Sequence, residues 1–191
     1  VGLNNELIPD IYRVGRDFYT YWFVCPLSPV EVQRGQHVWL NFRGINYKAE
    51  IYLNGKRVNS TTHEGMFLRQ SYDITPLLKA DSTNMLAVLV FPPDHVGNPN
   101  GGQGGDAQIA RNCTMQYTPG WDWIQPVRDR NTGIWDEVSI TTTGDVKVQH
   151  PYVVTKVPGV RNPEDKKQAP AFLETTVELE NVTQQTLQGT A

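Results

Sequence analysis

Cysteine is scarce in this sequence, which excludes a fold held together by disulfide bonds. The 191 residues contain only two cysteines, Cys25 and Cys113. Two cysteines cannot define a disulfide framework in a chain of this size, so we expect two separate thiols. The chain is long enough to bury a real core, and its length suggests one full domain plus a fragment or a small second domain.

Long apolar runs and clusters of basic residues are also missing. No apolar stretch approaches membrane-spanning length, and no signal peptide opens the chain, so we expect no membrane partner. Charged residues make up 19% of the sequence, the formal net charge is -3, and the basic residues are dispersed. This pattern argues against a nucleic-acid partner. The chain begins at Val1 without an initiator Met, and we expect both ends to be cut from something longer.

Patterns that bind metals or cofactors are absent too. The four histidines are scattered without metal-ligand spacing, and His63 is expected to hydrogen-bond within a turn. Asp and Asn side chains between residues 94 and 106 could ligate calcium, but a solvated loop explains them better. The glycine-rich stretch 93–106 lacks the Gly-Lys-Ser/Thr ending of a phosphate-binding loop. It is either a functional loop or a plain connector. We expect no metal and no cofactor.

What the sequence does contain is a period of two. Apolar and polar residues alternate over 38–43 and 49–53, and 85–91 is apolar on both faces, as in a strand inside a sandwich. Asn54-Gly55 is a strong hairpin signal. Further strands are predicted at 17–25 and 135–141, and one helical turn at 74–78, with Thr75 as its cap and Pro76 at its first position. The prediction is an all-β chain in two packed sheets.

The composition changes after Gly144. Residues 146–154 alternate again, a polar stretch with prolines covers 158–170, and residues 171–179 predict another strand with glutamates on one face. Two strands cannot make a sandwich by themselves. We therefore expect one domain over residues 1–145 and the opening strands of a second, incomplete β-sandwich over 146–191.

The segment Gly120-Trp121-Asp122-Trp123 carries the chemistry of a sugar subsite. Indole faces stack on the apolar C–H faces of sugar rings, and carboxylates accept hydrogen bonds from sugar hydroxyls. A tryptophan-rich core strand followed by a polar loop is the other interpretation of the same residues. The aromatic run from Tyr12 to Phe23 is better explained as a core-and-interface strand than as an exposed sugar platform, because no single face holds all six rings.

Five ordered motifs resemble the N-terminal sugar-binding domain of glycoside hydrolase family 2. They are Ile51-Tyr52-Leu53-Asn54-Gly55-Lys56-Arg57-Val58, His63-Glu64-Gly65, Tyr72-Asp73-Ile74-Thr75, Asn84-Met85-Leu86-Ala87-Val88 and Gly133-Ile134-Trp135. The resemblance covers roughly residues 10–145. Segments 102–106, 120–124 and 128–132 look most like the mannosylglycoprotein endo-β-mannosidases, with exo-β-glucosaminidases and β-mannosidases as close relatives.

The resemblance implies a jelly-roll, galactose-binding-like sandwich, followed by an immunoglobulin-like sandwich and a catalytic TIM barrel. In this family both catalytic glutamates lie on the barrel, and no glutamate here matches either motif. Retaining glycoside hydrolysis needs two carboxyl groups about 5 Å apart. We therefore expect a fragment without catalytic residues or turnover, from a parent that is a retaining glycosidase acting on β-mannosidic or β-glucosaminidic linkages.

The resemblance also implies roles for individual residues. Asp122 matches an aspartate that reaches the barrel's sugar site in related β-mannosidases, where it would accept hydrogen bonds from sugar hydroxyls. Either Trp121 or Trp123 would then line the pocket, because successive strand positions face opposite ways. The charged residues Arg128, Asp129 and Arg130 are expected to form an ion-pair network that shapes this loop or docks it on the barrel.

Two functions remain open from the sequence. The first is a domain that completes the carbohydrate pocket of a missing TIM barrel. The second is an autonomous carbohydrate-binding module that concentrates a polysaccharide without contributing to an active site. The compartment is not fixed by the sequence, although a bacterial source would imply a periplasmic or extracellular location.

Overall fold

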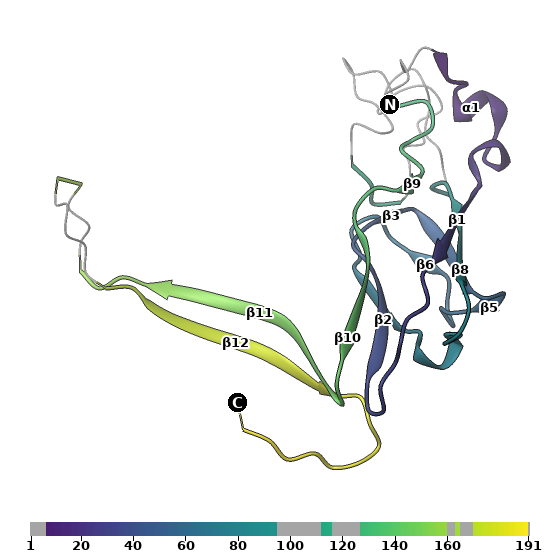
Figure 1. Cartoon of the computed structure of the whole chain (residues 1–191). Helices are drawn as coiled ribbons and strands as arrows, with labels where there is room; N and C mark the ends of the chain where they lie inside the picture. Colours follow the sequence, from purple (N-terminus) through teal and green to yellow (C-terminus); the bar gives the residue numbers. More distant parts are fainter. Residues whose placement is uncertain (1–6, 95–111, 116–126, 160–162, 165–169, 191) are drawn as a thin grey trace. The chain divides into compact units, whose positions relative to one another are not determined.

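The structure is a computed structural model that describes residues 7–94, 112–115, 127–159, 163–164 and 170–190. Contacts divide the chain into two compact units, Val1–Thr142 and Thr143–Ala191. The described residues form strands and only short helical turns, which confirms the all-β prediction (Figure 1). Among them, no helix is long and apolar enough to cross a membrane.

The first unit is a β-sandwich. Its elements are α1 (Ile11–Val14), η2 (Asp17–Tyr19), β1 (Tyr21–Leu27), β2 (His37–Phe42), β3 (Ile45–Asn46), β4 (Lys48–Leu53), β5 (Lys56–Arg57), β6 (His63–Glu64), β7 (Gln70–Asp73), η3 (Thr75–Leu77), β8 (Asn84–Phe91), β9 (Gly133–Ile134) and β10 (Val138–Thr143). One sheet has the order β1-β8-β4-β5, with β6 also paired to β4, and the second has the order β10-β2-β7. Strands β3 and β9 form a small separate ladder.

The core lies between these two sheets. Alternate residues of β2, β4 and β8 point inward, which is the reason for the period of two in the sequence. The buried cluster contains Val38, Leu40, Phe42, Ile45, Ala49, Ile51, Leu53, Ile74, Leu86, Val88 and Val90. An apolar cleft of about 530 Å³ lies beside it, where β1 and β10 are the edge strands of their sheets.

The hairpin after β4 forms as predicted. Asn54 and Gly55 have φ angles of 54° and 79°, the left-handed region that Asn and Gly tolerate best. The turn leads directly into β5, where Leu53 pairs with Lys56. The side chain of Asn54 adds support, because its Oδ1 accepts from the Met85 backbone N–H at 2.9 Å.

The helical turn after β7 begins at Thr75, but its cap was predicted wrongly. The Thr75 hydroxyl does not cap the turn; its Oγ1 accepts the Val38 backbone N–H at 2.8 Å. Asp73 takes the local role instead, since its Oδ1 accepts from the Thr75 N–H at 2.9 Å. Pro76 lies in the first turn as expected. Thr75 therefore links this turn to β2, a strand distant in sequence, which no local pattern reveals.

Two predicted strands are displaced. Residues 17–19 form the turn η2, and β1 starts only at Tyr21. Trp135 precedes β10, and its backbone N–H donates to the Gly44 carbonyl at 3.2 Å. The aromatic run is also divided: Tyr19 is 4% exposed, whereas Trp22 near the start of β1 is 56% exposed. Trp22 is therefore not part of the core of this unit, because β1 is an edge strand. Its assignment to an interface stays a prediction.

The second unit contains β11 (Val146–Lys156) and β12 (Phe172–Asn181), paired antiparallel. A register shift lies between Gln149 and Tyr152, where His150 has a φ of 49°. The apolar side chains of this ribbon are largely exposed, Leu173 at 68% and Val148 at 61%. A two-stranded ribbon with an exposed apolar side does not build a core of its own. Its assignment to an immunoglobulin-like domain stays a prediction.

Candidate functional site

The residues predicted to contact sugar lie outside the described part of the chain. Trp121, Asp122 and Trp123 belong to this group. The structure does describe residues on both sides of the 116–126 segment, namely 112–115 before it and the turn at 127–132 after it. The predicted residues Arg128, Asp129 and Arg130 all lie in that turn. The described part of the candidate site therefore consists of residues 112–115 and 127–132 and their contacts.

The turn at 127–132 is fixed by its own backbone and by Asp129. The Arg130 N–H donates to the Val127 carbonyl at 2.9 Å, and the Thr132 N–H donates to the Asp129 carbonyl at 3.1 Å. The Asp129 carboxylate accepts from the Asn131 N–H at 2.8 Å. Both Arg130 and Asn131 have positive φ angles, 54° and 53°. Non-glycine residues adopt this conformation at a cost, so other contacts must hold the turn.

Arg130 provides the first of these contacts. Its side chain is 1% exposed, an unusual place for a guanidinium. Nη2 lies 3.6 Å from Asp10 Oδ1, and Nη1 donates to the Val127 carbonyl at 2.6 Å. Burial lowers the pKa of Arg130 from its usual value, and the negative charges of Asp10 and Asp129 oppose that shift. The buried cation is therefore retained by nearby anionic groups.

The segment around α1 supplies the anionic partner. Asp10 caps α1, because its Oδ1 accepts from the Tyr12 N–H at 2.8 Å. The backbone of this segment also contacts the turn: the Ile11 N–H donates to the Arg128 carbonyl at 2.8 Å. In return, Arg128 Nη1 donates to the Ile8 carbonyl at 3.0 Å. One short segment near the start of the chain thus holds the turn through both side chains and backbone.

Asn46 in β3 holds the same turn from the sheet side. It is fully buried, and its Nδ2 donates to the carbonyls of Arg130 and Asn131 at 2.8 and 2.9 Å. Strand β3 pairs with β9 immediately after the turn, with Asn46 opposite Gly133. These two carbonyls belong to the two residues with positive φ, so Asn46 stabilises the strained part of the turn.

The other flank of the 116–126 segment rests on Met66. The Met115 N–H points to Met66 Sδ at 3.4 Å, and Trp135 Nε1 donates to the Met66 carbonyl at 3.0 Å. The Trp135 indole lies directly against Gly44, where an added Cβ would be only 2.3 Å from the ring. Met66 is 1% exposed. Buried side chains therefore anchor both flanks of the segment that carries the predicted sugar contacts.

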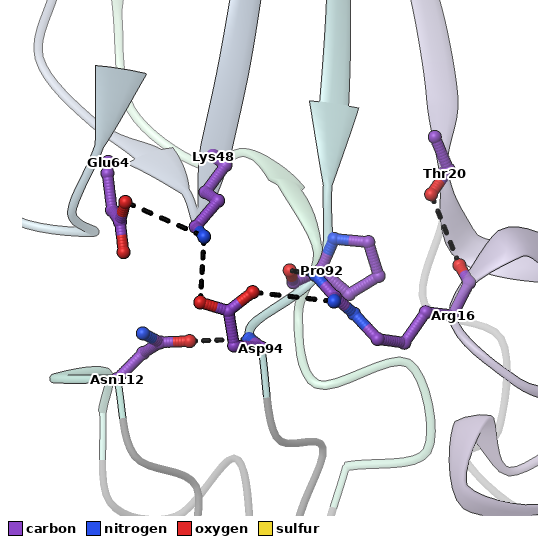
Figure 2. A network of polar contacts seen from close by, with 7 residues as sticks. All are labelled: Arg16, Thr20, Lys48, Glu64, Pro92, Asp94 and Asn112. Carbon is purple, nitrogen blue, oxygen red and sulfur yellow. Dashed lines mark hydrogen bonds and ion pairs between the residues drawn. The ribbon is translucent and has the colours of Figure 1, made fainter. Parts of the chain in front are cut away.

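Figure 2 shows a further polar network, centred on Asp94. Lys48 Nζ lies 2.7 Å from Asp94 Oδ2 and 3.6 Å from Glu64, and Arg16 Nη1 lies 3.4 Å from Asp94 Oδ1. The backbone N–H of Asp94 donates to Asn112 Oδ1. The hydrogen bond with Lys48 lowers the pKa of Asp94 and raises that of Lys48. Both oxygens of Asp94 thus face cations.

This network joins the two described residues that border the 95–111 segment, Asp94 before it and Asn112 after it. The other residues considered for calcium in this loop lie outside the described part. Contacts with Lys48 in β4 and with Arg16 just after α1 hold Asp94 in place, and Asp94 in turn contacts Asn112 (Figure 2).

Three glutamates of the first unit, Glu50, Glu64 and Glu137, contact cations or a hydroxyl group. Glu50 accepts from the Tyr52 hydroxyl at 2.7 Å, and Glu137 lies 3.4 Å from Arg43. His63 contacts the Gly65 carbonyl through Nε2 at 2.9 Å, which confirms the predicted turn contact. Burial lowers the pKa of His63.

Sequence reasoning identified the turn at 128–130 but missed its partners. Asp10 and Asn46 carry no motif, and they lie 120 and 84 positions before Arg130 in the numbering of this chain. Asp10 precedes a short apolar helix, so its capping role is visible in the sequence. Its pairing with a buried arginine is not, because a contact of this kind depends on the tertiary fold.

The comparisons with known proteins agree with this architecture. The profile of the family described as the glycosyl hydrolase 2 galactose-binding domain-like family matches residues 3–136. The chain therefore belongs to this family of sugar-binding-like domains. It is 52% identical over 186 residues to the mannosylglycoprotein endo-beta-mannosidase of Lilium longiflorum, which covers 94% of this chain and 18% of that protein.

More distant relatives extend the pattern. An exo-beta-D-glucosaminidase of Hypocrea jecorina is 30% identical over 148 residues, covering 76% of this chain and 14% of that protein. Two solved structures share the fold. The exo-chitosanase of Amycolatopsis orientalis has a TM-score of 0.59 at 24% identity, covering 86% of this chain and 16% of that one. The beta-D-mannosidase of Dictyoglomus thermophilum has a TM-score of 0.57 at 25% identity, covering 72% and 17%. The chain spans less than one fifth of each relative's length.

Proposed function

We propose that this chain is the non-catalytic sugar-binding domain of a larger retaining glycosidase that acts on β-mannosidic or β-glucosaminidic linkages. In this role it completes a carbohydrate pocket whose catalytic groups belong to a TIM barrel of the parent protein. The names of the relatives, an endo-beta-mannosidase and an exo-beta-D-glucosaminidase, suggest the linkage classes. The second unit would be the opening part of an immunoglobulin-like domain.

The observation that carries the proposal is the anchoring of both flanks of the 116–126 segment. Met115 rests on Met66 on one side, and Arg130 is buried against Asp10 on the other. A loop that contributes to a subsite must be held near its productive position before substrate arrives, because ordering it at binding would cost affinity. Buried anchors at both flanks meet that requirement better than a free connector would.

In this proposal, Asp122 accepts hydrogen bonds from hydroxyls of the sugar, and Trp121 or Trp123 lines the pocket. Arg128, Asp129 and Arg130 shape the loop. The contacts of Arg128 with Ile8 and of Arg130 with Asp10 support a loop-shaping role. Docking of the same residues on the barrel would require exposed charge, which Arg130 lacks.

The test is Asp122→Ala in the full-length parent enzyme. One hydrogen bond from a hydroxyl to a charged carboxylate contributes about 1.5–3 kcal/mol, so kcat/KM should fall roughly ten- to a hundredfold. Asp81→Ala removes an exposed carboxylate from the loop before β8 and serves as the matched control. Kinetics that are equal in the Asp122 variant and the control would refute the role of Asp122.

A further inference from the structure

The outer face of the five-stranded sheet carries an exposed aromatic pair that the proposed pocket does not use. Trp22 in β1 is 56% exposed, and its ring centroid lies 5.7 Å from that of Tyr52 in β4, with an interplanar angle of 50°. Strand β8 lies between these two strands. Neighbouring strands are about 4.8 Å apart, so the two backbones are separated by roughly 10 Å. The rings therefore lean toward each other.

The residue beneath them makes this possible. Ala87 in β8 is directly opposite Tyr52 on one side and Val24 on the other. Its small side chain takes up little of the space over β8 between the two rings, although Leu89, which pairs with Trp22, points to the same face. Alternation places Trp22 and Tyr52 on the face opposite the core residues Leu86 and Val88.

Polar groups border the rings on the same face. Glu50 lies in one row with Leu89 and Trp22 across the sheet. Its Oε2 accepts from the Tyr52 hydroxyl at 2.7 Å, and its Oε1 lies 3.4 Å from Arg57 Nη2. Arg57 Nη2 also donates to Thr62 Oγ1 at 2.9 Å. The carboxylate is held in place, yet the side chains of Glu50 and Arg57 keep 25% and 38% of their surface exposed.

We propose that Trp22, Tyr52, Glu50 and Arg57 form a second carbohydrate contact, which binds a pyranose ring on the outer face of the sheet. The indole would stack on the C–H face of the ring, while the carboxylate accepts from one hydroxyl and the guanidinium donates to another. We call these four residues the β1–β4 platform. The platform is independent of Asp122, which belongs to the proposed pocket.

The mixture of groups favours a sugar over a protein partner. The buried centre of a protein interface is depleted in acidic residues, whereas here the Glu50 carboxylate lies beside the Tyr52 hydroxyl and is paired with Arg57. A sugar ring needs both parts, an apolar stacking surface and charged hydrogen-bonding groups at its edge. Because the Glu50–Arg57 pair is partly solvated, its geometry can adjust to hydroxyl groups at little cost.

The experiment uses the complete 191-residue chain and two probes, β-1,4-mannotetraose and the glucosamine tetramer. Millimolar probe should shift the NMR signals of Trp22 Nε1–H and of the Tyr52 ring. Trp22→Phe keeps a stacking ring and should retain binding. Trp22→Leu keeps only apolar surface and should weaken binding about tenfold, the loss of one aromatic contact. Met85→Ala, which trims an exposed side chain of the same face, should have no effect.

Three results would overturn the platform: no shifts at Trp22 and Tyr52 with either probe, binding that Trp22→Leu leaves intact, or equal weakening by Met85→Ala. If Trp22→Leu fails to fold, the shifts in the unaltered chain and the binding of Trp22→Phe still test whether the platform binds sugar. Asp122→Ala should leave the shifts at Trp22 unchanged. Refuting the role of Asp122 would therefore not affect the platform, and refuting the platform would not affect the role of Asp122.

Discussion

The buried pair between Arg130 and Asp10 makes the sharpest test of how the turn at 127–132 is held. Asp10→Asn removes the negative charge but keeps an oxygen that can accept from the Tyr12 N–H and cap α1. The guanidinium of Arg130, 1% exposed, then lacks its nearest anionic partner. Removing one member of a buried pair costs about 3–5 kcal/mol. Because Arg130 keeps its bond to the Val127 carbonyl, we expect the lower end, about 3 kcal/mol.

The assay is urea unfolding of the 191-residue chain, followed by tryptophan fluorescence. A loss of about 3 kcal/mol is a large share of the 5–15 kcal/mol that stabilises a typical domain. Asp10→Ala should cost about 1 kcal/mol more, since it also removes the cap. The double variant Asp10→Asn with Arg130→Met leaves no buried charge, so it should be less destabilised than the sum of the two single variants.

A cost below about 1 kcal/mol for Asp10→Asn, the range of an exposed ion pair, would refute the anchoring role of the Arg130–Asp10 pair. Additive effects of the two substitutions would refute it as well, because the two side chains would then act independently. In that case the turn would be held by Asn46 and by its own backbone bonds, and the burial of Arg130 would serve packing alone.

Two further predictions concern the sandwich itself. Gly44→Ala should destabilise the chain by about 1–3 kcal/mol in urea unfolding, because the new Cβ would meet the Trp135 ring at 2.3 Å. Gly144→Ala is the control, because its new Cβ meets nothing within 4 Å. Equal stabilities of the two variants would contradict the packing of Trp135 against Gly44. Burial lowers the pKa of His63 in the folded state. The stability that depends on a neutral His63 is therefore fully present above the unfolded pKa of about 6.5, and it is lost as the pH falls below that value. His63→Gln should flatten the pH dependence of the urea midpoint in that range, and an unchanged slope would show that His63 does not cause it.

The strands could be predicted from the sequence wherever one face is buried. β2 and β4 follow the predicted alternation, because inward residues such as Leu40 and Ile51 must be apolar. The edge strand β1 was harder, because it is apolar on both faces and still exposed. Local signals gave the hairpin at Asn54-Gly55, since its backbone requirement is local. Thr75 was misassigned because its hydroxyl bonds to Val38, in a strand far along the chain.

For the candidate site, the sequence indicates which residues carry the chemistry, but it does not indicate which residues hold them in place. The pairing of indoles with a carboxylate at 120–123 suggests sugar binding by its composition, and Arg128, Asp129 and Arg130 stand out as a charged cluster. The groups that hold this cluster, Asp10 and Asn46, look ordinary in sequence. Their roles arise from burial and from contacts across the fold, and neither burial nor distant pairing leaves a periodic or spacing signal.

The anchors hold the described residues that border the 116–126 segment, as the proposed function requires. Fixing the backbone of each residue costs about 1–2 kcal/mol of conformational entropy. Part of that cost is met on folding for the residues that border the 116–126 segment. Arg130 and Asn46 hold the turn that follows the segment, and Met66 contacts Met115 just before it. Under the proposed function, we expect substitutions at these positions to weaken sugar binding without removing any contact with sugar. A loss of activity in such a variant must be compared with that of Asp122→Ala. It identifies an anchor only when Asp122→Ala lowers activity without lowering the stability of the fold.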